Sequence, residues 1–234
     1  MSAQKTYSIR CPKCDHTQTV ELYDSINVAQ EPELKKALFE NRLNRVVCED
    51  CDASFRIDKP VLYHDADRNI LIHWMPDNVV SRDKILDEFD KSMEELRDAL
   101  PEGMEHPRVR LVFDRVELIE LIFMVEAGMD ERVVEYIKYT AHTQNTKRLP
   151  PDKKQLLLNV LDSTADELLF AIRDVETAEL EDILRYSRES YRGVQKMYRN
   201  NPDEFMELFP GPYINARTTL LEEGADDEPE ENVQ

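Results

Sequence analysis

The feature that most constrains this chain is the placement of its cysteines. All four occur in two C-x-x-C pairs separated by 33 residues: Cys11, Cys14, Cys48 and Cys51. Two residues between ligands let a tight turn aim both sulfur atoms at one ion, and two such turns complete a tetrahedral site of four thiolates. The spacing therefore predicts one metal centre. Because four thiolates leave no open coordination position, we expect the metal to be structural rather than catalytic.

Zinc is the metal that we expect at this centre, and two alternatives remain open. Rubredoxin-type iron uses the same four-sulfur geometry. Two independent redox pairs would need a thioredoxin-like βαβ setting, which the sequence does not show. Four ligands and one structural zinc ion are therefore the prediction, with iron as the second choice of metal.

The two turns are predicted to share one backbone shape. The residue after the second cysteine of such a turn often needs a positive φ, for which glycine is best suited. Here those positions are Asp15 and Asp52. Aspartate tolerates this conformation better than most residues, so the same replacement in both turns indicates the same shape twice.

The chain is predicted to be an α+β protein in three parts. Residues 1–78 form a zinc-ribbon-like, β-rich module, with a short helix over 32–43 inserted between the cysteine pairs. Residues 79–221 form a mainly α-helical domain, and residues 222–234, with seven acidic and no basic side chains, form a disordered acidic tail.

In the second part, apolar spacing and capping residues predict several helices. Their expected positions are 81–100 with Ser81 as the N-cap, 109–127, a helix capped by Asp130, and 202–209. A further helix is expected to start at Thr177 and to carry the apolar side chains of Leu180, Ile183, Leu184, Tyr191 and Val194. Between them, 156–161 and 168–172 predict a β-hairpin.

Charge and hydropathy limit the classes of partner and the cellular compartment that we expect for this protein. The net charge is -19, and the acidity lies mostly downstream of residue 78, which argues against nucleic-acid binding by the whole chain and favours a protein partner. No stretch of about 18 apolar residues predicts a membrane span, and residues 1–10 contain no apolar signal core. We therefore expect a cytoplasmic protein, in which thiols stay reduced.

At this point the sequence resembles the CpXC domain family, named for a Cys-Pro-x-Cys motif. The resemblance covers 8–76 and extends through 118–138. It rests on the following residues: Cys11-Pro12-Lys13-Cys14, Ile26-Asn27, Cys48, Cys51 and Tyr63-His64-Asp65. It implies a zinc-binding domain of bacteria and archaea with no established activity. The aspartates at 15 and 52 depart from the glycines usual in the family.

Three further groups of residues have alternative interpretations. Tyr63, His64 and Asp65 could form an enzymatic site, because a histidine beside a carboxylate can be oriented for acid–base work; the structural alternative is a hairpin turn. Glu117 and Glu120 predict a solvated or salt-bridged stripe rather than a metal pair. A nucleic-acid-associated ribbon would use the following basic residues: Arg10, Lys13, Arg42, Arg45 and Arg56.

The sequence thus favours a non-enzymatic zinc-binding protein that acts as a protein-interaction or regulatory module. An enzyme with a site at residues 63–65 and a nucleic-acid-associated zinc ribbon are the alternatives. No phosphate-binding glycine loop or hydrolase motif accompanies the cysteines.

Overall fold

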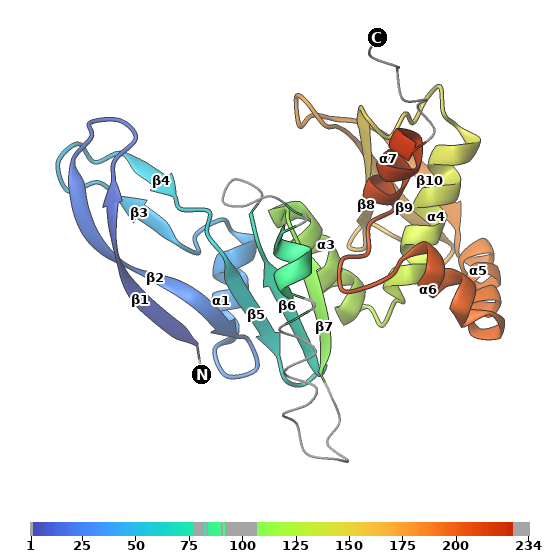
Figure 1. The fold of residues 1–234 in the computed structure, drawn as a ribbon, viewed down its shortest axis with the longest axis horizontal. Coiled ribbons are helices and arrows are strands. Elements are labelled where there is room, and N and C mark those ends of the chain that lie inside the picture. Colours follow the sequence, from blue (N-terminus) through green and yellow to red (C-terminus); the bar gives the residue numbers. More distant parts are fainter. Residues whose placement is uncertain (1, 77–81, 83, 90, 92–106, 227–234) are drawn as a thin grey trace, which may run out of the picture. The chain divides into compact units, whose positions relative to one another are not determined.

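The computed structural model of the chain describes residues 2–76, 82, 84–89, 91 and 107–226 (Figure 1). The N-cap predicted at Ser81 and most of the helix after it lie outside these residues, although 84–89 are helical. Both halves combine helices with β-sheet, which confirms the α+β class. The chain divides into two compact units, Met1–Leu118 and Ile119–Gln234, and each is described by itself.

A five-stranded mixed sheet organises the first unit. Its strands, in spatial order, are β1 (Ala3–Arg10), β2 (Thr17–Asn27), β5 (Val61–Asp65), β6 (Ile70–Trp74) and β7 (Arg108–Val112). The pairs β1–β2 and β5–β6 are antiparallel, whereas β2–β5 and β6–β7 are parallel. A parallel pair needs a long connection, and the one from β2 to β5 carries the rest of the metal-binding module.

That connection contains helix α1 (Pro32–Phe39) and a two-stranded hairpin of β3 (Arg45–Val47) and β4 (Ser54–Arg56). Leu34 and Leu38 of α1 are buried, as the predicted apolar face requires. The helix ends four residues before the predicted end at residue 43. Asn41 and Asn44 have φ values of 59° and 54°, a left-handed conformation that a helix cannot include.

The helix predicted over 109–127 is wrong in its first part. Residues 108–112 form β7, which extends the sheet, and only then does helix α3 (Arg115–Glu126) begin. Glu117 marks this start, because its carboxylate accepts hydrogen bonds from the N–H groups of Phe113 and Asp114 at 3.2 Å each. The first unit therefore extends 40 residues past the predicted boundary at residue 78.

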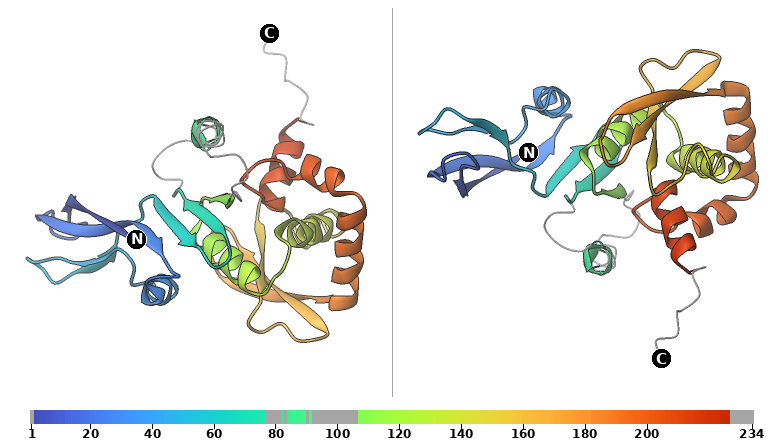
Figure 2. Two further views of the ribbon diagram at one scale, coloured as in Figure 1. Left: turned by 90° about the horizontal axis from the view of Figure 1, so that it is seen from below. Right: turned by 90° about the horizontal axis from the view of Figure 1, so that it is seen from above.

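In the second unit a three-stranded antiparallel sheet is accompanied by helices (Figure 2). The elements are α4 (Glu131–Gln144), β8 (Lys154–Asn159), β9 (Glu167–Asp174), β10 (Leu180–Ser187), α5 (Arg188–Asn200), α6 (Pro202–Leu208) and α7 (Ala216–Asp226). The predicted hairpin is confirmed as β8–β9, and Asp130 caps α4 by accepting from the N–H of Arg132 at 3.1 Å. Among the described residues, no helix has both the length and the apolar composition needed to cross a bilayer.

The helix predicted from Thr177 is wrong in its first part, because residues 177–187 form a turn and then strand β10. Its second part is confirmed, because Tyr191 and Val194 lie in helix α5. The carboxylate of Asp174 accepts hydrogen bonds from the N–H groups of Glu176 and Thr177 and so shapes the turn. The strand pairs with β9, and the helix starts only at Arg188, capped by Ser187. In the predicted disordered tail, residues 222–226 are helical as the end of α7, and 227–234 lie outside the described residues.

Three charged side chains are buried together in the second unit. The ammonium of Lys138 lies 2.7 Å from the carboxylate of Glu120 and 2.6 Å from that of Glu135. Burial raises the pKa of Glu120 to about 7, although Lys138 opposes that shift. The salt-bridged interpretation of Glu120 is confirmed, while Glu117 acts separately as a helix cap.

Candidate metal centre

The four cysteines lie in the turns of two β-hairpins. Cys11 and Cys14 connect β1 to β2, and Cys48 and Cys51 connect β3 to β4. Their four Sγ atoms lie within 4.8 Å of one another, and the Sγ distances are 3.7 Å for Cys11–Cys51 and 3.6 Å for Cys14–Cys48. A tetrahedron with metal–sulfur bonds of about 2.3 Å has edges of about 3.8 Å. The four cysteines could therefore hold one metal ion.

Both turns have the same backbone, as predicted. In each, the N–H of the first cysteine donates to the carbonyl five residues later, at 2.8 Å for Cys11 and 2.9 Å for Cys48. The N–H of Asp15 donates to the carbonyl of Cys11, and the N–H of Asp52 to the carbonyl of Cys48, both at 3.0 Å. Asp15 has φ 61° and Asp52 has φ 56°, so both occupy the left-handed conformation for which aspartate is tolerated.

The environment of the sulfur atoms is uneven. Cys11 and Cys48 are buried, whereas Cys14 and Cys51 are partly exposed. Burial alone would raise the pKa of the Cys11 thiol, but hydrogen bonds from the backbone amides of Lys13 and Cys14 lower it to about 7. Backbone amides also act to lower the pKa of Cys14 and Cys51, but burial and hydrogen bonds with Cys48 and Cys11 raise the pKa of both thiols, that of Cys14 to about 12. The thiolate form, which binds a metal, is therefore favoured at Cys11 and disfavoured at these two positions.

Gln18 fastens the two hairpins to each other, a role that the sequence analysis missed. Its side-chain amide donates to the carbonyl of Val47 at 3.0 Å and accepts from the N–H of Glu49 at 3.0 Å. These two residues flank Cys48, so Gln18 fixes the backbone on both sides of a ligand. The sequence did contain an indication of this role, because Gln18 lies on the same face of its strand as Leu22, where an apolar residue would be expected.

Asn44 makes a similar contact at the other end of the second hairpin. Its side-chain amide accepts from the N–H of Tyr23 at 2.7 Å and donates to the carbonyl of the same residue at 3.0 Å. Asn44 is buried, and its own carbonyl accepts from the N–H of Ile57 at 3.0 Å. The second hairpin is thus attached to β2 by a buried carboxamide at each end, one of them close to the sulfur atoms.

Four of the five basic residues considered for nucleic-acid binding are engaged by neighbouring side chains. Arg10 pairs with Asp15 at 3.0 Å. Arg56 pairs with Asp58 at 2.6 Å. Arg45 donates to the hydroxyl of Ser54, and Arg42 pairs with Glu40. Three of the five charges, those of Arg10, Arg42 and Arg56, are therefore balanced locally, whereas Lys13 and Arg45 form no ion pair within the part of the chain that the structure describes.

The residues considered for an enzymatic site do not converge. Strand alternation in β5 puts Tyr63 and Asp65 on one face, where both are buried, and His64 on the other. Asp65 accepts from the N–H of Arg68 and pairs with its guanidinium at 2.9 Å, as expected for a residue that shapes the turn to β6. His64 lies instead beside Asn27, with 3.3 Å between its Nδ1 and the side-chain nitrogen of Asn27.

Comparison with known proteins agrees with this geometry. A family model described as CpXC protein matches residues 9–138, which is more than half of the chain and includes all four cysteines. Neither the curated proteins nor the solved structures provide a match.

Proposed function

The chain belongs to the CpXC family, and on that premise we propose that it is a zinc-binding protein whose metal is structural and whose role is to engage a protein partner. The observation that carries the zinc assignment is the convergence of four sulfur atoms from two turns of identical shape. Their separations of 3.6 and 3.7 Å suit the edges of a tetrahedral zinc–thiolate site. Four thiolates complete that tetrahedron, so the metal has no position for a substrate.

The two facing hairpins support a zinc-ribbon-like description of this module. Strands β3 and β4 have only three residues each, and a hairpin of that size is not stable alone. A structural zinc ion in a small module contributes about 10–16 kcal/mol of apparent binding energy, which is also folding energy. We infer that the metal and the two carboxamide contacts together keep the second hairpin folded.

Metal analysis of the purified full-length protein tests the assignment. We expect about one zinc ion per chain, and iron, or no near-stoichiometric metal, would refute it. The Cys48→Ser variant should lose the metal and the cooperative unfolding transition of the first unit. Asp50→Ser changes an exposed residue of the same turn and should retain both. A Cys48→Ser protein with unchanged unfolding would show that the centre is not structural.

A protein-binding role is supported better than the two alternatives. The enzyme hypothesis required the Asp65 carboxylate to orient the His64 ring, and these two side chains lie on opposite faces of β5. The nucleic-acid hypothesis is weakened by the local pairing of Arg10 and Arg56 and by a net charge of -19. We place the protein in the cytoplasm, where the four thiols would remain reduced and available to the metal.

A further inference from the structure

The three-stranded sheet of the second unit has an apolar outer face in addition to its buried inner face. The inner face is formed by buried side chains of β8 and β9: Leu156, Leu158, Leu168, Phe170 and Ile172. Cross-strand pairing puts Leu157, Ala171 and Ile183 in one row across the outer face, and Leu169 lies in the next row. The solvent-facing side of such a sheet is usually polar, so this row is not explained by folding alone.

This outer face is hollowed. A cavity of about 650 Å³ is lined by apolar residues of β9 and β10, among them Leu169, Ala171, Leu180 and Ile183. Leu180 is 69% exposed and Ile183 is 50% exposed, which is unusual for large aliphatic side chains that line a concavity. A volume of this size is in the range of sites that bind ligands. The hollow can therefore accommodate aliphatic side chains of a bound segment.

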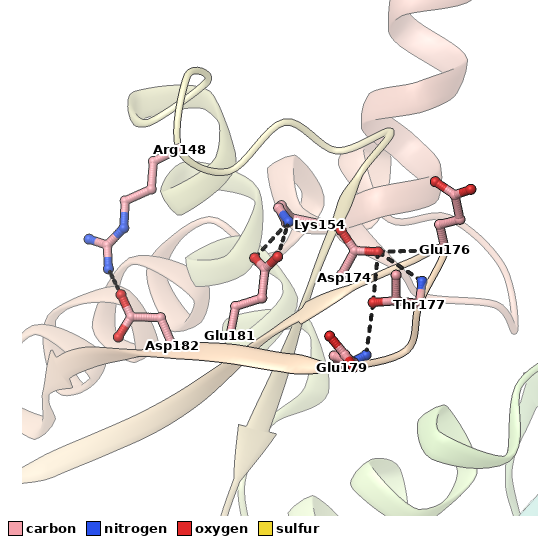
Figure 3. Close-up of polar contacts among 8 residues, drawn as sticks. All are labelled: Arg148, Lys154, Asp174, Glu176, Thr177, Glu179, Glu181 and Asp182. Atoms are coloured by element: carbon pink, nitrogen blue, oxygen red, sulfur yellow. Dashed lines mark hydrogen bonds and ion pairs between the residues drawn. The ribbon is translucent and has the colours of Figure 1, made fainter.

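The surroundings of the hollow are acidic. Its lining contains three carboxylates, those of Asp162, Glu181 and Asp182, and one cation, Arg185, which pairs with Glu167 at 2.9 Å. Two of the lining carboxylates have cations already, because Glu181 pairs with Lys154 and Asp182 with Arg148 (Figure 3). Asp162, which also lines the hollow, accepts a hydrogen bond from Asn159 at 2.7 Å and forms no ion pair within the described part of the chain. A cationic group of a partner would find its counter-charge there.

The edge of this sheet that borders the hollow is less suited to binding than its face. Strand β10 is the edge strand on that side, and its register shifts between Leu180 and Asp182, as in a β-bulge. A bulge and acidic side chains on an edge strand discourage the addition of another strand. A second copy of this chain is also disfavoured as the occupant, because each copy carries a net charge of -19.

We propose that the hollow on the outer face of β8–β10 is a docking surface for a basic peptide segment of a partner protein, which inserts aliphatic side chains beside Leu180 and Ile183 and a cation near Asp162. This inference rests on the proposed function for the idea of a protein partner. It does not depend on the metal, since every residue named belongs to the second unit.

Two synthetic peptides of equal charge test this proposal by calorimetric titration into the full-length protein. Acetyl-KRKLLKRK-amide should bind about tenfold more tightly than acetyl-KRKSSKRK-amide, because partial burial of two leucines contributes at least the 1.4 kcal/mol that a tenfold ratio needs. Equal affinity of the two peptides for the wild-type protein, or no binding by either, would overturn the proposal without the use of any variant.

Variants then locate the site. The double variant Leu180→Ser with Ile183→Ser should abolish the preference for the leucine peptide. Met206→Ser, which removes an aliphatic side chain that is 44% exposed elsewhere in the same unit, should retain it. Asp162→Asn should weaken both peptides and reduce the salt dependence of binding. A preference that survives the double variant would place the site elsewhere.

Two further measurements separate the outcomes. In sedimentation, we expect the wild-type protein and the double variant to have the same association state. If the wild-type protein self-associated and the double variant did not, a second copy would be the occupant of the hollow and the proposal would be overturned. Zinc content is measured on the same preparation. A protein without zinc that still prefers the leucine peptide would refute the zinc assignment and leave the docking surface supported.

Discussion

Replacement of Gln18 by alanine tests how the two hairpins of the metal-binding module are joined. The side chain is 6% exposed and makes one hydrogen bond to each residue that flanks Cys48. The Gln18→Ala variant removes both bonds and leaves all four cysteines in place. We therefore expect it to weaken both the fold of the module and its hold on the metal.

The magnitude follows from what is lost. An internal hydrogen bond between neutral groups contributes about 0.5–1.5 kcal/mol net, so two contribute about 1–3 kcal/mol. Val47 is 56% exposed as a residue, so we expect water to replace the Gln18 side chain at the freed carbonyl and do not add the larger penalty for a buried group without any partner. A contact that orients a ligand from outside the coordination sphere affects metal affinity by roughly 10–100-fold, and we expect the lower end of that range.

The free energy of unfolding in urea and competition with a zinc chelator measure the two effects. Thr19→Ala is the matched control, since Thr19 is the adjacent exposed residue of the same strand and should change stability by less than about 0.5 kcal/mol. If Gln18→Ala matched this control in both assays, the hairpins would not be joined through Gln18.

Two other predictions concern charged groups. Burial acts to raise the pKa of Asp24, but the hydrogen bond that Lys59 donates to its carboxylate holds the pKa well below the usual range. The ionised carboxylate therefore stabilises the fold above about pH 4, and this stabilisation is lost as the pH falls through the folded-state pKa. Asp24→Asn should therefore reduce the loss of stability between about pH 4 and 2 in urea titrations, and an unchanged acid slope would contradict this. Lys138→Met leaves Glu120 and Glu135 buried without their cation and should cost about 3–5 kcal/mol of unfolding free energy. The exposed Lys196→Met should cost almost nothing, and similar values for both lysine variants would refute the argument.

Features that depend on neighbours in sequence were predictable. The cysteine spacing predicts a shared site, and Asp15 and Asp52 predict the turn shape, because ligand and turn are each defined within a few residues. The cap at Asp130 and the hairpin of β8 and β9 are local in the same sense.

Features that depend on distant partners were not predictable in this way. Strand β7 is a strand because β6, more than 30 residues earlier, offers it an edge. The roles of Gln18 and Asn44 depend on backbone groups 21 to 31 residues away. Only the position of Gln18 on the same strand face as the apolar Val20 and Leu22 indicated that its side chain had a buried partner.

The error in β10 has a physical cause that bears on function. In a strand with one solvated face, apolar residues alternate with polar ones. In β10, Leu184 pairs opposite Phe170 of the buried face, while Leu180 and Ile183 are exposed, and apolar residues on both faces reproduce the spacing of a helix. Folding requires only the inward residue. A departure from the pattern that folding alone would produce is expected where a sequence serves a second requirement. Leu180 and Ile183, two of the residues that made the segment resemble a helix, also line the hollow, so a docking role explains both observations.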